Sequence, residues 1–166
     1  MHSNRRRARA ATPRLALCLV LTSASACAGG EPAGPLFPPA PSGDVELESL
    51  EASLDNIQRY ILTPACATAG CHDAQTQAGL LDLSNADASY DGLVGADGEG
   101  VAAANRVAAE NRWLRVKPGD PERSFLYRKL ELPGVGEGGP MPVGPDQISE
   151  PYMHWIHIWI EDGAPR

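Results

Sequence analysis

The sequence lacks several features that would point to common classes of protein. Aromatic residues make up only 5% of its 166 residues. It has no internal repeat, no phosphate-binding loop and no pairing of a nucleophile with a base that would suggest catalysis. No segment alternates apolar and polar residues as a half-buried β-strand does. These absences argue against an enzyme and against a β-sheet fold.

The first 26 residues have the order of a secretory signal peptide. Five arginines between Arg5 and Arg14 precede an apolar run from Leu15 to Leu21, which is followed by small residues before Cys27. The apolar run is far shorter than the roughly 20 residues needed to span a bilayer. We therefore expect residues 1–26 to be removed on export.

The residues before Cys27 resemble a lipobox, after which bacteria attach diacylglycerol to the cysteine and cleave in front of it, although Ala24 stands where leucine is usual. Residues 27–43 are rich in proline and glycine, as a flexible tether is. This pattern predicts a lipidated Cys27 and a membrane-anchored protein in the periplasm or cell envelope. The alternative is an ordinary signal peptide cut after Ala26, leaving Cys27 as a free thiol.

Acidic residues dominate the part of the chain that would remain after export. Removing residues 1–26 takes away five arginines and no acidic residue, so the formal net charge falls from −7 to −12. Nucleic acids are bound by basic surfaces. We therefore expect no nucleic-acid partner.

Residues 44–166 form the expected folded domain, which is long enough for one core. Apolar residues from Leu47 to Ile61 recur at helical spacing, with Ser42 or Asp44 as a cap and Pro64 as the end. Three further helices are predicted: 85–94, a helix after Pro121 that buries Phe125, Leu126, Leu130 and Leu132, and a last helix that starts after Ser149 and ends at Gly163. The stretch 96–109 gives no clear assignment. The fold class predicted is all-α, with long glycine- and proline-rich loops.

The most informative segment is Cys66–His72, in which two cysteines separated by four residues are followed directly by a histidine. Thiols do not persist unmodified in an oxidising compartment, so Cys66 and Cys71 should be joined to each other or to another group. Covalent haem attachment uses two thiols and a histidine immediately after the second, usually with two residues between the cysteines. The longer spacing is similar to a variant of multihaem cytochromes.

A second axial ligand to a haem iron would come from a loop far along the chain. Met141 is the only methionine in a loop of this domain, and it lies between Pro140 and Pro142, which stiffen the backbone. A thioether ligand raises the reduction potential of haem iron. Met141 is therefore the candidate, with gap-filling in the core as the alternative role.

The order of these features resembles the small cytochrome c-like domains of exported bacterial proteins, over roughly residues 45–166. The resembling segments are the first helix, Cys66–His72, Gly79–Ser84, Arg115–Pro121 with Ser124–Leu126, Met141–Pro142 and the terminal Ile156–Pro165. The resemblance implies an all-α class I cytochrome c fold whose first and last helices cross. It implies one covalent haem c held by Cys66 and Cys71, with His72 as proximal and Met141 as distal ligand. The implied activity is electron transfer between redox partner proteins, without enzymatic chemistry.

The sequence leaves open an alternative to haem binding and an alternative to Met141 as the distal ligand. The domain can be a haem-free structural or interaction domain of the same kind, in which Cys66 and Cys71 form a disulfide. His154 and His157 lie three residues apart on the last helix and are interpreted as surface or interface histidines. His154 is a weaker rival to Met141 as the distal ligand.

Overall fold

The computed structural model describes residues 51–145 and 147–166, all of which belong to one compact unit. The predicted signal peptide, Cys27, the tether and the predicted start of the first helix lie outside these residues. The described part is all-α and contains no named strand, only two isolated bridges, Ala102 to Leu114 and Leu114 to Ser124. The predicted fold class is confirmed at this level.

Within the described residues the first helix begins at Leu54, and it ends later than the sequence predicted. Residues 51–53 precede α1 (Leu54–Ile57), and Ser53 caps it through its side chain, which accepts a hydrogen bond from the Asn56 amide at 3.4 Å. The helix then continues without a break as η2 (Gln58–Cys66), a π-helix with Pro64 inside it. Because proline has no N–H to donate, the wider hydrogen-bonding register lets the helix pass Pro64, as in the 2.8 Å bond from Ala67 N–H to Leu62 O.

The last helix, α5 (Glu150–Glu161), has the predicted bounds. Ser149 is the N-cap residue and Pro151 lies in the first turn. Gly163 adopts the left-handed conformation that ends many helices, with φ of 93°. Behind this end, the Trp159 indole N–H donates to Pro165 O at 2.8 Å, which holds the C-terminal residues against the helix.

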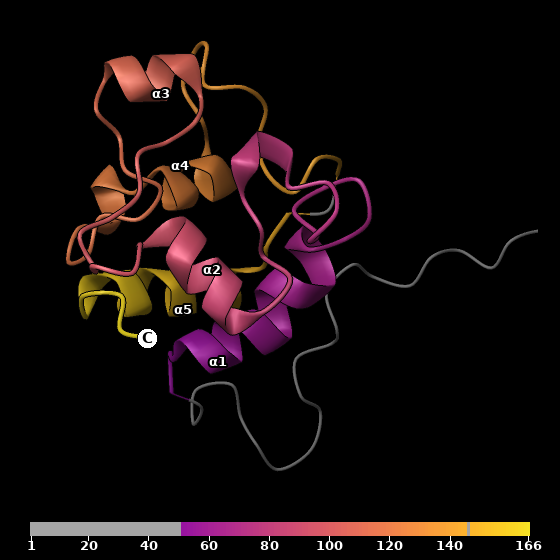
Figure 1. Ribbon diagram of the computed structural model, residues 1–166, viewed down its shortest axis with the longest axis vertical. Helices are drawn as coiled ribbons and strands as arrows, with labels where there is room; N and C mark the ends of the chain where they lie inside the picture. The colour runs from indigo at the N-terminus through magenta and orange to yellow at the C-terminus, as the bar shows by residue number, and fades with distance from the viewer. Residues whose placement is uncertain (1–50, 146) are drawn as a thin grey trace, which may run out of the picture. The chain divides into compact units, whose positions relative to one another are not determined.

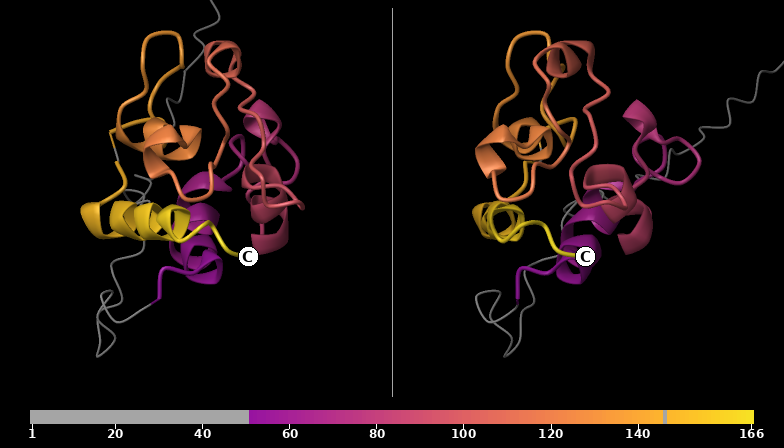
Figure 2. Two further views of the ribbon diagram at one scale, coloured as in Figure 1. Left: turned by 90° about the vertical axis from the view of Figure 1, so that its left-hand side faces the viewer. Right: turned by 60° about the vertical axis from the view of Figure 1, so that its left-hand side comes forward.

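The first and last helices pack together, as predicted. The Tyr60 ring lies edge-on to the Trp155 ring, with centroids 6.0 Å apart. Their apolar faces belong to one buried cluster, which includes Leu54, Ile57, Ile61, Trp155, Ile156 and Trp159. The two helices run in different directions where they meet (Figure 2). This junction is the centre of the hydrophobic core.

The remaining helices are short and build the other side of the domain. They are η3 (Ala78–Leu80), α2 (Ala86–Leu93), α3 (Arg106–Glu110), η4 (Pro121–Arg123) and α4 (Phe125–Glu131). The predicted short helix 85–94 is confirmed as α2, whereas α3 was not predicted. It starts where the Asn105 side chain accepts from the Ala108 amide at 3.0 Å. Figure 1 places α4 between α3 and α5.

The helix predicted after Pro121 is split into η4 and α4 at Ser124. This residue is fully buried and extended, and its hydroxyl accepts from the Lys117 amide at 2.8 Å and donates to Asp120 O at 2.9 Å. At the break the amides of Phe125 and Leu126 donate to Leu114 O and Arg115 O, at 2.9 and 2.8 Å, instead of to carbonyls of η4. The burial predicted for Leu132 is wrong, because α4 ends one residue earlier and the side chain is 77% exposed.

Candidate functional site

An apolar cavity of about 410 Å³ lies between the end of η2, α2 and α4. This volume falls within the range of small-molecule and cofactor sites. Much of its wall is aliphatic or aromatic, from Leu81, Leu83, Leu93, Phe125, Leu126 and Leu130. Three predicted site residues also line it: Cys66 and His72 from the motif, and Met141 from a loop far along the chain.

His72 is held at this cavity by its backbone. Its N–H donates to Cys66 O at 3.1 Å, and its carbonyl accepts from the Leu83 amide at 2.8 Å. The ring nitrogen Nδ1 is buried and has no hydrogen-bond partner among the described residues. An unpaired buried polar atom costs about 1–3 kcal/mol, so a group that engages the imidazole would relieve an existing cost.

The two cysteines of the motif lie in different surroundings. Cys66 is half-buried at the cavity. The pKa of its thiol is raised from 9.0 to about 12, mainly because burial disfavours the thiolate and secondly because the nearby Cys71 repels its charge. Cys71 is exposed and does not line the cavity. The two thiols are free, so no disulfide joins them in this structure.

Asp73 folds the loop that carries the motif. Its carboxylate accepts hydrogen bonds from the amides of Gly70, Gln75 and Thr76 at 2.7–2.9 Å. The bond from the Thr76 amide is the largest cause of the lowered pKa of this carboxyl. The resulting turn brings Cys71 back alongside Ala78, whose amide donates to Cys71 O at 2.9 Å.

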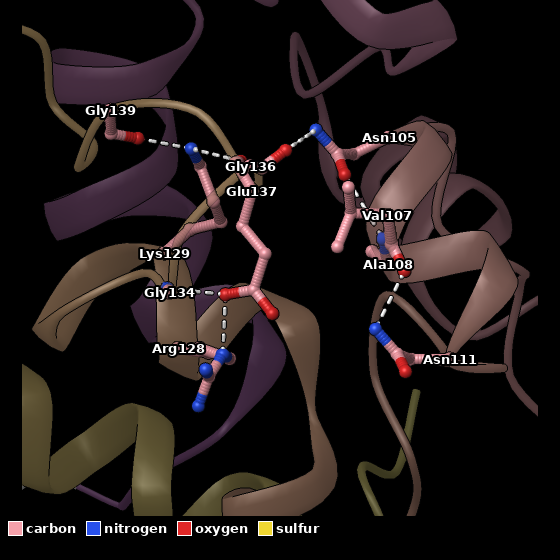
Figure 3. A network of polar contacts seen from close by, with 10 residues as sticks. All are labelled: Asn105, Val107, Ala108, Asn111, Arg128, Lys129, Gly134, Gly136, Glu137 and Gly139. Atoms are coloured by element: carbon pink, nitrogen blue, oxygen red, sulfur yellow. Dashed lines mark hydrogen bonds and ion pairs between the residues drawn. The ribbon is translucent and has the colours of Figure 1, made fainter.

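Met141 lines the cavity from a loop that is tied to α4. Figure 3 shows Lys129 of α4 bonded to this loop at Gly139. The Met141 amide donates to Lys129 O at 2.8 Å, and the Lys129 ammonium donates to the carbonyls of Glu137 and Gly139. Met141 is half-buried against the main core cluster. The loop is therefore fixed at its backbone on both sides of Gly138.

A buried carboxylate closes the same loop. The Glu137 side chain is only 5% exposed and pairs with the Arg128 guanidinium at 2.5 Å. Burial alone would raise the pKa of Glu137, but hydrogen bonds from Arg128 and the Gly134 amide, with the charges of Arg128 and Lys129, lower it overall. Glu137 is thus a charged anchor for the 134–141 loop (Figure 3).

Comparison of the whole chain with known proteins found no matching family model, curated relative or solved structure. The described residues contain no helix long and apolar enough to cross a membrane. They also contain no group of three or more histidine, cysteine and acidic side chains that could hold a metal ion.

Two cations at the cavity, Arg115 and Lys129, were not predicted as site residues. The Arg115 guanidinium donates to the carbonyls of Gly92, Gly79 and Leu80 at 2.8–3.0 Å. Burial lowers the pKa of both side chains. Arg115 has no ion pair with any described carboxylate, so an anionic group in the cavity would meet an unpaired positive charge.

The two histidines of α5 lie away from the cavity. His154 is exposed, and His157 packs its ring edge-on against Tyr127 with centroids 5.5 Å apart. His157 Nδ1 is also 3.7 Å from the Glu161 carboxylate. Neither histidine lines the cavity, whereas Met141 does.

Proposed function

We propose that this protein is an exported, membrane-tethered c-type cytochrome of the class I fold that transfers single electrons between redox partner proteins. The observation that carries the proposal is the convergence of Cys66, His72 and Met141 on one apolar cavity. The packing of the first and last helices supports the fold assignment. The membrane tether is proposed from Cys27 and residues 27–43, which lie outside the described residues.

The residues around the cavity suit haem chemically. Haem is a largely apolar macrocycle with two carboxylate side chains, and the cavity combines an apolar wall with the cations Arg115 and Lys129. In this proposal His72 and Met141 would hold the haem iron, and Cys66 and Cys71 would hold the macrocycle through thioether bonds. When bound, the haem iron would accept and release one electron.

The protein's own residues would set how this electron is held. As a ligand to haem iron, the Met141 thioether would favour the reduced state and so raise the reduction potential. The apolar wall would keep water from a bound macrocycle, and this exclusion of water also tunes the reduction potential. The loop fixed by Lys129 and Glu137 would hold the thioether in place through both oxidation states.

An absorption spectrum tests the proposal directly. The full-length chain should be matured in a bacterial host that attaches haem to the longer cysteine spacing, then purified from its envelope. We expect one haem per chain that stays with the chain after denaturation. A Cys66→Ser/Cys71→Ser variant should lose this covalent haem.

If the wild-type protein carries no haem and gains two titratable thiols only on reduction, the electron-transfer proposal fails. The Cys66–Cys71 disulfide and a structural role would then stand. Tethering is tested separately, because Cys27→Ser should release the protein from the membrane without changing its spectrum.

A further inference from the structure

A second, larger hollow of about 750 Å³ shares Glu137 with the apolar cavity. Its chemistry is different, because four basic side chains line it: Arg112, Lys117, Arg123 and Arg128. Trp113 forms part of the wall, and the Arg128 guanidinium lies over its ring at 5.1 Å from the centroid. The hollow was not predicted from the sequence.

The hollow is lined mainly by positively charged residues, although the protein as a whole is negatively charged. The chain has a net charge of −7, yet Glu137 is the only acidic residue in the hollow's lining. Glu137 is neutralised by Arg128, and Lys117 pairs with Asp120 at 2.7 Å. Among the described residues, Arg112 and Arg123 have no ion pair. Two guanidinium groups therefore remain available in a concave, positively charged site.

The backbone at Arg112 adds a second observation. Arg112 has a φ of 58°, in the left-handed region that long side chains seldom adopt. Non-glycine residues in this region cluster at binding sites, where the surrounding structure holds them. Here α3 ends at Glu110 with Asn111 as its C-cap, and Arg112, the next residue, lines the hollow.

We propose that this hollow binds a small oxyanion with two or more negative charges, of the diphosphate or tricarboxylate type. Guanidinium groups bind phosphate and carboxylate oxygens in a two-pronged geometry. The cations come from three segments, 111–114, 117–123 and α4, and converge on a space of small-molecule size. This convergence favours a compact ligand over the flat surface of an acidic protein. The inference does not depend on the proposed haem.

Calorimetric titration of the full-length protein with inorganic pyrophosphate and, separately, with citrate tests the site. We expect saturable binding of at least one of them, with one ligand per chain. Arg112→Gln/Arg123→Gln should weaken this binding by about tenfold or more, because both unpaired guanidinium groups and their charged hydrogen bonds to the anion are lost. Arg112→Lys/Arg123→Lys should retain part of the affinity, which separates loss of charge from misfolding.

The matched control is Arg59→Gln/Arg106→Gln, which removes two exposed arginines outside the hollow. This variant should bind the anion as the wild-type protein does. Equal weakening in both glutamine variants would mean non-specific attraction and would overturn the proposal. Absence of saturable binding to both anions by the wild-type protein would overturn it as well.

Discussion

The edge-on contact between Tyr60 and Trp155 joins the two ends of the described fold. Tyr60 lies in η2 and Trp155 in α5, so their 6.0 Å ring separation fixes one helix against the other. The motif cysteine Cys66 ends η2. The position of the cavity relative to the core therefore depends on this junction.

Trp159 is the residue whose loss should damage the junction most. Its side chain is 1% exposed and its indole N–H is bonded to Pro165 O. Trp159→Ala should lower the free energy of unfolding by about 3–5 kcal/mol, since a large cavity is left in the core. Chemical denaturation followed by circular dichroism measures this. The control is His154→Ala, which changes an exposed residue of the same helix and should alter the free energy of unfolding by no more than about 0.5 kcal/mol.

The sequence predicted those features that are determined by residues in or next to the feature itself. The apolar spacing of α5 lies within the helix and its end signals, Ser149 and Gly163, lie next to it, and the Cys66–His72 motif is a short contiguous segment. The prediction that Pro64 ends the first helix was wrong, because a helix can pass a proline by widening its turns to a π-helix. A sequence pattern does not reveal which hydrogen-bonding register the helix adopts.

The unpredicted residues act through contacts distant in sequence. Arg115 bonds to carbonyls 23–36 residues away, which no spacing pattern indicates. Glu137 stands in a stretch of glycine and proline that we interpreted only as a loop. Its single charge in that stretch was the available signal, but its partner Arg128 lies on a separate helix.

Glu137→Gln should loosen the loop that carries Met141. The variant loses a charged hydrogen bond with Arg128 in a mostly buried site, and we expect a loss of about 1–3 kcal/mol in the free energy of unfolding. Amide hydrogen exchange should rise over residues 134–141 and little elsewhere. The exposed Glu131→Gln on α4 is the control and should leave both measurements unchanged.

The effect of Glu137 should depend on pH in a defined direction. Its pKa is lowered from 4.5 on folding, so its stabilising contribution is complete above pH 4.5 and is lost as pH falls through the lower folded value. The stability difference between wild type and Glu137→Gln should therefore be largest near neutral pH and shrink in acid. A difference that grows in acid would contradict the role of the ionised carboxylate.

The two thiols should react at different rates in protein made without haem and kept reduced. Only the thiolate is nucleophilic, and the pKa of about 12 for Cys66 leaves it protonated at pH 8. Iodoacetamide should therefore modify the exposed Cys71 first, as peptide mass spectrometry would detect. In denaturant the two should react alike, and equal rates in the folded protein would contradict the burial of Cys66.

Met141 and His72 line the same cavity from segments far apart in the sequence, so we expect Met141 to be the second ligand of a bound haem iron. In the haem-loaded protein, Met141→Ala should abolish the weak sulfur-to-iron charge-transfer band in the far red and lower the reduction potential, because a thioether ligand favours reduced iron. The haem should remain covalently attached, since Cys66 and Cys71 are intact. Met153→Ala removes a half-buried methionine of α5 that does not line the cavity, so its spectrum should match that of the wild type. An unchanged band in Met141→Ala would assign the ligand to another group.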